Sequence, residues 1–480
     1  TITFDLGIRT GMVWQSGTIR LEFIPKRIQL ASDGYERQDE MHGNSGIYRL
    51  IVPADSVTPG EPLRLRVDPE PPKEGTVSFF MIKDRQNATE VSTRTNSEEI
   101  AQLQDDVSQL RRVISALSHK LYPELFRERV QSKETVLYQP GRDQCNDLDL
   151  TMTDDGSLLL AFRQAAEHVA PNGRTVLLRS AGDTEAWEKP QTVIQFPWPA
   201  DIRAHTFHRV GSNSWIMSIL VFSNIDEGGE RREPDPSRGD YETWLLRSDD
   251  DGRSWTLDSK PLDPGPLTDV TVFSPTVRLP NGRLLMPVSS CLSAPPSAAL
   301  FASDDNGQSW RFHSSIGDIP SEYVTRFPET TLARGESGKL LTMVRVSNGN
   351  YLKSFSYDDG RSWTDWEETP IPCYGTRGRL VTLSGGEMLL SYAWRSRRRD
   401  ALDDLGAIKI ALSQDEGATW ASEDIRVLRD DFLNWDMGYP VTVELGDGRL
   451  FTVYWGNQMD RYYIAANLWE KWWCGEAKLS

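Results

Sequence analysis

The stretch Ser248-Asp-Asp-Asp-Gly-Arg-Ser-Trp255 decides the fold, because its pattern returns three more times along the chain. The later copies are Ser303-Asp-Asp-Asn-Gly-Gln-Ser-Trp310, Ser356-Tyr-Asp-Asp-Gly-Arg-Ser-Trp363 and Ser413-Gln-Asp-Glu-Gly-Ala-Thr-Trp420. All four fit Ser-x-Asp-x-Gly-x-Ser/Thr-Trp, and a fifth window, 180–187, keeps only the outer two residues. The windows start at 180, 248, 303, 356 and 413, so they are 68, 55, 53 and 57 residues apart. This even spacing predicts a repeat architecture.

The chemistry of the repeated pattern is that of a tight turn. Ser and Asp side chains bind backbone amides, Gly takes a left-handed or closely packed position, and Trp packs beneath the hairpin. We therefore interpret the pattern as a structural turn and not as a catalytic site. The spacing is close to that of a four-stranded propeller blade with its loops. Residues 132–480 then hold six blades, and the run Thr135-Val-Leu-Tyr138 would close the ring as the outer strand of the last blade.

Two regions precede the repeats. Residues 1–96 alternate in short β-like runs, such as 46–52 and 63–67, which predicts a β-sandwich. Residues 97–131 change to a heptad pattern, which predicts a helix over 98–122 with a coiled-coil seam. One seam position holds Ile100, Val107, Ile114 and Leu121, and the other holds Leu103, Leu110 and Leu117. The chain then either forms a homo-oligomer through this helix or packs the helix on its own domains. The expected fold is mainly β: a six-bladed β-propeller with an N-terminal β-sandwich and a connecting coiled-coil-like helix.

Composition restricts the partners of the chain. Lys and Arg number 53 against 70 Asp and Glu, and the net charge of -17 argues against nucleic acid as a general partner. No run of 18 apolar residues is present, so no membrane span is expected. The cysteines at 145, 291, 373 and 474 are far apart, which favours isolated buried thiols over a metal cluster. Because the chain opens at Thr1, a removed leader is one interpretation, and a secreted or periplasmic location is favoured.

The repeated windows resemble the Asp boxes, or BNR repeats, of the sialidase superfamily, and this resemblance covers residues 132–480. Asp boxes alone specify a fold and not a chemistry. In the fourth blade, Phe327-Pro-Glu329 and the strand that ends at Arg345 are similar to the segments whose Glu partners the nucleophile and whose Arg binds the substrate carboxylate. In the sixth blade, Gly438-Tyr439-Pro-Val resembles the strand that presents the nucleophilic Tyr. A packing tyrosine and a plain ion pair are the structural alternatives.

The choice of a phenol as nucleophile has a physical reason. An ionised carboxylate nucleophile would be repelled by an anionic substrate, whereas a neutral phenol is not. Sialidases are the recognised exception among glycosidases in using tyrosine. The resemblance therefore implies a substrate that carries a negative charge close to the bond that is cleaved.

The resemblance breaks in the first blade. Its opening segment reads Cys145-Asn146-Asp147-Leu148-Asp149-Leu150, without the arginine that the family has there. The family's acid/base Asp is also missing after the strand 158–162, where Glu167 or His168 would substitute. In the fifth blade the third arginine is ambiguous among four positions, and an exposed basic loop is the alternative. These positions are Arg395, Arg397, Arg398 and Arg399.

The second blade contributes Asp201-Ile-Arg203-Ala-His205-Thr-Phe-His208. Strand alternation predicts that Asp201, Arg203 and His205 share one face and that His208 lies on the other. A histidine, Tyr439 and an arginine also suit β-elimination on a uronic acid, in which His takes the α-proton and Tyr protonates the leaving oxygen. A structural histidine is the alternative for both positions.

The expected function is that of a sialidase-like glycoside hydrolase, which acts on terminal acidic sugars and requires neither a metal nor a cofactor. A polysaccharide lyase and a non-catalytic carbohydrate-binding propeller are the alternatives. The catalytic candidates are Tyr439, Glu329, His205 and His208. The substrate-binding candidates are Arg345, Arg163, Arg203, Arg397 and Asp436. Because the arginine set and the acid/base Asp are incomplete, we expect ordinary sialosides to be poor substrates.

Overall fold

The computed structural model describes residues 130–472 with short gaps, together with the backbone of six strands between residues 2 and 83. The gaps are 181–182, 198, 226–231, 324, 326, 374–375, 396–405, 422–423, 431, 433–435 and 459–460. The chain divides into two compact units, with a boundary between Ile114 and Ser115. Each unit is described by itself below.

The first unit holds two antiparallel sheets. One has the strand order β3-β4-β1-β6, and the other pairs β2 with β5. The strands are β1 (Ile2–Thr10), β2 (Gly17–Leu21), β3 (Gln29–Ala31), β4 (Ser45–Val52), β5 (Leu65–Pro69) and β6 (Val77–Lys83). The alternating run at 46–52 thus lies within β4, and the run at 63–67 overlaps β5 from residue 65, while the packing of these strands as a sandwich stays a prediction. The helix over 98–122 lies outside the described residues, so its coiled coil and the homo-oligomer also stay predictions.

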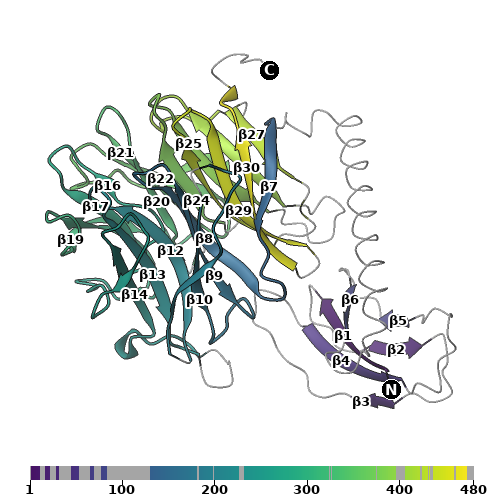
Figure 1. The fold of residues 1–480 in the computed structure, drawn as a ribbon. Helices are drawn as coiled ribbons and strands as arrows, with labels where there is room; N and C mark the ends of the chain where they lie inside the picture. The colour runs from purple at the N-terminus through teal and green to yellow at the C-terminus, as the bar shows by residue number, and fades with distance from the viewer. Residues whose placement is uncertain are drawn as a thin grey trace. The chain divides into compact units, whose positions relative to one another are not determined.

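The second unit is a propeller of six four-stranded antiparallel sheets (Figure 1). Blade one holds β8 (Gln144–Met152), β9 (Leu158–Ala165), β10 (Arg174–Arg179) and β11 (Gln191–Gln195), and blade two holds β12 (Asp201–Arg209), β13 (Trp215–Phe222), β14 (Tyr241–Ser248) and β15 (Thr256–Leu257). Blade three holds β16 (Val277–Arg278), β17 (Leu284–Ser290), β18 (Ser297–Ser303) and β19 (Arg311–Asp318), and blade four holds β20 (Thr330–Arg334), β21 (Leu340–Val344), β22 (Asn350–Ser356) and β23 (Glu367–Pro372). Blade five holds β24 (Gly378–Thr382), β25 (Met388–Trp394), β26 (Ala407–Ser413) and β27 (Ile425–Arg429), and blade six holds β28 (Gly438–Glu444), β29 (Leu450–Gln458), β30 (Arg461–Trp469) and β7 (Ser132–Tyr138).

The ring closes as the sequence predicts. Strand β7, which precedes blade one in the chain, is the outer strand of blade six and pairs with β30 from Trp469 opposite Ser132 to Ile464 opposite Tyr138. The last blade therefore takes one strand from the start of the propeller and three from its end. Pairing of this kind leaves no unmatched strand edge between the two ends of the ring.

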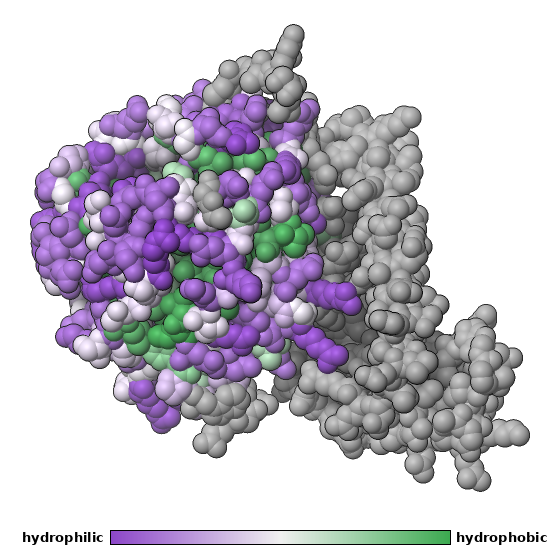
Figure 2. All heavy atoms as spheres, viewed as in Figure 1, coloured by the Kyte–Doolittle hydropathy of each residue, from purple (hydrophilic) through white to green (hydrophobic). Residues whose placement is uncertain are grey.

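The core lies between the blades. Strands β9 and β13, the second strands of blades one and two, are buried along their whole length, because both faces of a blade pack on neighbouring blades. They are therefore rich in apolar residues, whereas the outer strand β7 is largely exposed. In the view of Figure 2 hydrophilic residues cover most of the described propeller surface, and hydrophobic residues form smaller patches between them. Such a surface is ordinary for a globular domain.

The Asp box is a closed network of hydrogen bonds. In blade two, the hydroxyl of Ser248 accepts from the amide of Gly252 (2.8 Å), and Oδ1 of Asp250 accepts from the amides of Arg253 (3.0 Å) and Ser254 (2.8 Å). The hydroxyl of Ser254 donates to Oδ2 of Asp250 (2.6 Å). Equivalent bonds recur at Ser303, Ser356 and Ser413. The interpretation of the repeat as a turn is therefore confirmed.

Each box glycine is required for two reasons. Gly252 and Gly417 have φ angles of 80° and 81°, in the left-handed region that favours glycine. A Cβ on Gly252 would also lie 2.2 Å from Cδ1 of Leu159, in the preceding blade. A Cβ on Gly417 would lie 2.2 Å from Cδ2 of Leu341, again in the preceding blade. The boxes thus lock each turn and bring successive blades into close contact.

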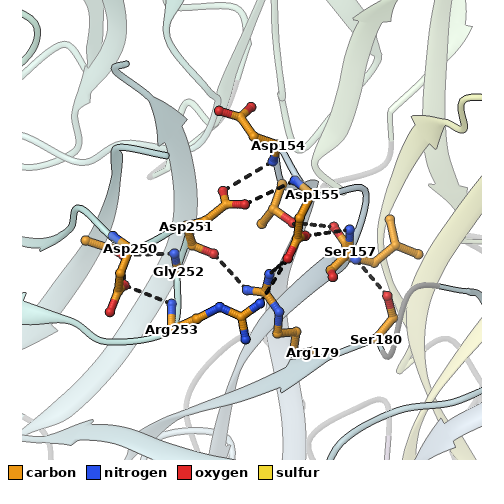
Figure 3. Close-up of polar contacts among 12 residues, drawn as sticks. Asp154, Asp155, Ser157, Arg179, Ser180, Asp250, Asp251, Gly252 and Arg253 are labelled. Carbon is orange, nitrogen blue, oxygen red and sulfur yellow. Dashed lines mark hydrogen bonds and ion pairs between the residues drawn. The ribbon is translucent and has the colours of Figure 1, made fainter. Parts of the chain in front are cut away.

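Figure 3 shows this contact between blades one and two. The carboxylate of Asp251 accepts from the amides of Asp154 and Asp155, both at 3.2 Å, and from the indole nitrogen of Trp215 at 2.9 Å. Arg179 donates to the carbonyl of Asp251 (2.7 Å) and to Oδ2 of Asp155 (2.7 Å). Polar groups on these turns therefore satisfy one another across the blade boundary, which identifies the cluster as an interblade joint.

Candidate active site

Three inner strands share one irregularity. In β28, β8 and β12, two residues face one on the neighbouring strand, which is the pattern of a β-bulge. Each bulge places a residue other than glycine in the left-handed region, with φ angles of 50° at Tyr439, 50° at Asp147 and 52° at Ala204. Such conformations are costly and concentrate at functional sites. The inner strands of blades six, one and two are therefore candidates for a functional site.

Long-range contacts show that these bulges face the axis of the ring. Arg377, at the start of blade five, donates to the carbonyl of Leu148 in blade one (3.2 Å). Arg379, in the strand β24 that follows, donates to Oδ1 of Asp149 (2.5 Å). Blade six lies between blades five and one in the ring, so these bonds do not follow a blade boundary. They run across the centre of the propeller.

Tyr439, Glu329 and Arg345 come together at this centre. The hydroxyl of Tyr439 donates to Oε1 of Glu329 (3.5 Å), and Nη1 of Arg345 donates to the same oxygen (2.8 Å). The glutamate directly precedes β20, and the arginine directly follows the paired strand β21. Its amide also donates to the carbonyl of Glu329 (3.2 Å). The hairpin therefore fixes both side chains against the tyrosine from the bulge of β28.

Burial and charge set the ionisation of this group. Burial raises the pKa of the Tyr439 phenol, and the neighbouring Glu329 carboxylate raises it further, so the phenol is neutral at physiological pH. Burial alone would lower the pKa of Arg345, but the Glu329 carboxylate outweighs it and raises the pKa. Oε2 of Glu329 is buried and has no hydrogen-bond partner among the residues that the structure describes. The carboxylate thus keeps one oxygen able to accept a proton.

Two more arginines surround the tyrosine. The guanidinium of Arg377 lies over the ring of Tyr439, 4.7 Å from its centroid. Arg395 follows β25 as Arg345 follows β21, and its Nε donates to the carbonyl of Met437 (3.1 Å). A Cβ on Gly438 would lie 3.2 Å from Nη2 of this arginine, so glycine leaves room for it. Of the four arginines considered in blade five, Arg395 lies at the site, and Arg397, Arg398 and Arg399 lie outside the described residues.

Arg377 and Asp147 were missed by the sequence reasoning. Arg377 immediately precedes the inner strand of blade five, at the position that Glu329 occupies before the inner strand of blade four. That equivalence was the available signal. Asp147 lies in the segment from which the expected arginine is absent, and Nη1 of Arg203 donates to its Oδ2 (2.9 Å). Burial would raise the pKa of Asp147, but Arg203 and Arg377 outweigh it and lower the pKa to about 2.

Arg163 is fully buried in an ion pair and does not line the site. Its Nε and Nη2 donate to the two oxygens of Asp201 at 2.7 and 2.8 Å, and both side chains are fully buried. This bidentate pair occupies the guanidinium, so the geometry argues against a direct contact between Arg163 and a substrate. Nε of Arg203 lies 3.5 Å from the same carboxylate. The geometry supports a role for Arg163 and Asp201 in positioning Arg203.

The contacts of β12 sort its polar side chains by blade. Asp201 and Arg203 bind Arg163 and Asp147 of blade one, and His205 contacts the carbonyl of Asp147 and the hydroxyl of Thr175 in the same blade. His208 instead accepts from the amide of Thr276, which directly precedes β16 of blade three. These contacts agree with the prediction that Asp201, Arg203 and His205 share one face of the strand and that His208 lies on the other.

Both histidines are fully buried and use both ring nitrogens. His205 donates from Nδ1 to the carbonyl of Asp147 (2.8 Å) and accepts the hydroxyl of Thr175 at Nε2 (2.9 Å). Nδ1 of His208 accepts the amide of Thr276 (3.1 Å), and its Nε2 contacts Ser218 (3.0 Å). Burial lowers the pKa of His205 to about 4 and that of His208 to about 3. This geometry supports structural, neutral histidines.

The remaining candidates occupy different parts of the propeller. Asp436 accepts hydrogen bonds from Nδ2 of Asn457 (3.1 Å) and from the hydroxyl of Tyr462. Glu167 and His168 lie on the loop after β9 and are exposed. Three cysteines, Cys145, Cys291 and Cys373, are buried and form no disulfide among the described residues, as predicted, and Cys474 lies outside the described residues.

No group of three or more His, Cys, Asp or Glu side chains in the described part of the chain is placed to hold a metal ion. Within the same residues, no helix has the length and apolar character needed to cross a membrane.

Comparison with known proteins supports the fold. Residues 219–452 match the BNR repeat-like domain family. No curated protein matches the chain at a significant level. A protein of unknown function from Dyadobacter fermentans has a similar structure, with a TM-score of 0.59 and 22% identity over 72% of this chain and 100% of its own.

Sialidase structures are also similar. The leech intramolecular trans-sialidase has a TM-score of 0.51 and 15% identity over 71% of this chain and 70% of its own. The Trypanosoma rangeli sialidase has a TM-score of 0.52 and 16% identity over 72% of this chain and 58% of its own. At these identities the likeness concerns the fold. Residues 219–452 thus resemble the BNR repeat-like domain family, and they lie within a six-bladed propeller whose fold is similar to that of the sialidases.

Proposed function

We propose that the propeller is a glycoside hydrolase for terminal sugars that carry a carboxylate. The observation that carries this proposal is the group formed by Tyr439, Glu329 and Arg345, in which a phenol and a guanidinium meet one carboxylate oxygen. The fold alone does not specify an activity, so the proposal rests on these side chains.

The tyrosine is proposed as the nucleophile. As its oxygen bonds to the anomeric carbon, the phenolic proton passes to Glu329, which already accepts it in a hydrogen bond. The glycosidic C–O bond breaks at the same carbon, and water later releases the sugar from the tyrosine. Because the phenol is neutral before the attack, an anionic substrate approaches it without repulsion.

Arginines supply the preference for an anion. The guanidinium groups of Arg203, Arg345, Arg377 and Arg395 lie near the tyrosine. The carboxylates of Asp147, Asp201, Glu329 and Asp436 interact with three of them. Arg345 and Arg395 are proposed to bind the substrate carboxylate, since charge-assisted bonds of this kind are stronger than neutral ones.

The departures in blade one bear on the substrate. Asp147 occupies the segment in which a sialidase has its first arginine, and the proton for the leaving oxygen is proposed to come from Glu167 or His168 on the exposed loop after β9. Loss of one arginine contact lowers affinity by about one to two orders of magnitude. We therefore expect simple sialosides to be poor substrates and uronic acids to be better ones.

The histidine-based lyase receives no support from the geometry. Abstraction of an α-proton requires a histidine with a free nitrogen and a pKa near neutrality. His205 and His208 are fully buried, and their pKa values are lowered to about 4 and about 3. A non-catalytic carbohydrate-binding propeller is an outcome that the experiment below distinguishes.

The experiment is a panel of acidic oligosaccharides with products identified by mass. Hydrolysis adds one water to the products, elimination adds none, and binding without turnover indicates a lectin-like propeller. Tyr439→Phe should reduce turnover by about 10²-fold or more while the melting temperature is unchanged, because only a hydroxyl is removed. The exposed Tyr357 provides the matched control, Tyr357→Phe. Activity of Tyr439→Phe within about threefold of wild type would contradict the proposal.

A further inference from the structure

We propose that Asp147 and Arg203 form a second recognition subsite, which binds hydroxyl groups of the sugar whose carboxylate is bound by Arg345 and Arg395. This inference rests on the proposed function and adds the part of the substrate that blades one and two recognise. It assigns a role to an aspartate that stands where the resemblance leads one to expect an arginine.

The acceptor of this subsite is Asp147. The bulge of β8 holds it at a φ of 50°, and its side chain keeps an exposed fraction of 11%. Oδ2 accepts from Arg203, and among the described residues Oδ1 receives no hydrogen bond. The nearby arginines keep the carboxylate ionised, as its pKa of about 2 indicates. An ionised carboxylate oxygen accepts hydrogen bonds from hydroxyl groups and carries no proton to donate.

The donor is Arg203. Its Nη1 binds Asp147, and its Nη2 is buried without a hydrogen-bond partner in the part of the chain that the structure describes. A buried guanidinium nitrogen without a partner is costly, and few such groups persist in folded proteins. The ion pair between Arg163 and Asp201 holds this arginine in place, because the Asp201 carboxylate also lies 3.5 Å from Nε of Arg203. The unpaired nitrogen therefore indicates a polar ligand atom at this position.

The charge of the subsite selects hydroxyls over a second anion. Asp147 and Arg203 together carry no net charge, and each leaves at least one hydrogen-bonding atom available among the described residues. A donor and an acceptor side by side match a hydroxyl group, which both donates and accepts. A carboxylate ligand would gain one bond from Arg203 and be repelled by Asp147. A sugar ring that bears hydroxyls and one carboxylate fits both subsites at once.

Two probes separate the subsites. D-Glucuronate carries a carboxylate and ring hydroxyls, and tetrahydropyran-2-carboxylate carries the same carboxylate on a ring without hydroxyls. Titration calorimetry or ligand-detected NMR with the full chain measures both affinities in wild type, Asp147→Asn, Asp147→Gly and Arg345→Met. Asn and Gly both tolerate a positive φ, so these variants should keep the bulge, and their melting temperatures check this.

The two probes should respond differently to the loss of the Asp147 charge. Loss of the Asp147 charge should weaken glucuronate binding by about tenfold to hundredfold, because a hydrogen bond to a charged group is lost. The same loss should leave binding of tetrahydropyran-2-carboxylate unchanged or tighter, since a repulsive anion is removed. Equal changes for both probes, or none, would overturn the inference and leave the carboxylate site standing. Failure of both probes to bind wild type would overturn the proposed function, and this inference with it.

Discussion

The outer turns and the inner bulges of the propeller use the same strained backbone for different ends. At the outside, Asp251, Asn306, Asp359 and Glu416 have φ angles between 55° and 60°, one in each Asp box. At the centre, Asp147, Ala204 and Tyr439 have φ angles between 50° and 52°. The outer residues occupy one position of a repeated pattern, whereas the inner ones differ in kind from blade to blade.

The hydrogen bonds show what this difference means. Within a box, the Ser and Asp side chains bind the turn's own amides, so hydrogen bonds inside the motif offset the backbone strain. At the centre, Oε2 of Glu329 and Nη2 of Arg203 are buried without partners among the described residues. Ser and Asp side chains that satisfy a repeated turn stabilise a fold, whereas buried groups without partners that vary from blade to blade and gather at the centre are consistent with a ligand. The following variants test that contrast, beginning with the largest expected effect.

The first variant, Glu329→Gln, tests the proposed role of Glu329 as proton acceptor at the centre of the ring. An amide cannot take the phenolic proton of Tyr439 as a carboxylate does, so turnover should fall by about 10²- to 10⁴-fold. The melting temperature should change little, because Gln keeps the shape and still accepts from Arg345. Steady-state kinetics on the best substrate of the panel measures the effect, with Glu185→Gln, at an exposed glutamate, as the control. Turnover equal to that of the control would show that Glu329 is only a structural ion-pair partner.

The second variant, Gly417→Ala, tests how much an outer Asp box contributes to the free energy of unfolding. Alanine at a φ of 81° is strained, and its Cβ would collide with Leu341 at 2.2 Å, so we expect a loss of about 3 to 5 kcal/mol. Gly282→Ala is the matched control, because its φ is 88° and no atom lies within 4 Å of the new Cβ. The control should lose about 1 kcal/mol. Equal losses in denaturant unfolding would mean that interblade contact adds nothing at the box.

These two regions also show how much the sequence can predict. The six blades and the closing strand over 135–138 could be predicted from the repeat. The hydrogen bonds of the Ser and Asp side chains lie within eight consecutive residues, so the whole motif is visible in the sequence. Tyr439, Glu329 and Arg345 were found for another reason, namely their resemblance to known segments. Their pairing inside one site required the structure, since Tyr439 and Glu329 are 110 residues apart.

Other parts of the site left no usable pattern in the sequence. A bulge shifts strand alternation by one residue, and nothing in the run from Asp201 to His208 marks where the extra residue falls. Arg377 reaches Leu148 across 229 residues and from a blade that is not adjacent to blade one in the ring. Periodicity describes neighbours along one strand, so it carries no information about contacts across the axis.

The third comparison uses one box position in two blades. Asp251 accepts three hydrogen bonds from blade one and its own blade, whereas the carboxylate of Asp359 only approaches Arg361 at 4.0 Å. Asp251→Gly should therefore cost about 2 to 3 kcal/mol, since buried donors lose their acceptor. Asp359→Gly should be neutral or gain up to about 1 kcal/mol, because glycine relieves the positive φ. Equal unfolding free energies would show that the carboxylate at this position does not join blades.

The smallest expected effect is the acid sensitivity of the boxes. Hydrogen bonds from the hydroxyl and amide of Ser309 lower the pKa of Asp305 to about 2, below its ordinary value of 3.8. A lowered pKa in the folded state gives stability that is complete above about pH 4 and is lost as the pH falls towards 2. Asp305→Asn should thus be less stable than wild type at neutral pH, and the two unfolding curves should converge near pH 2. Ser309→Ala removes one donor but keeps the carboxylate, so it should lose part of the same pH dependence. Parallel stability curves for wild type and Asp305→Asn between pH 5 and 2 would show that this box carboxylate binds protons equally well in the folded and unfolded chain.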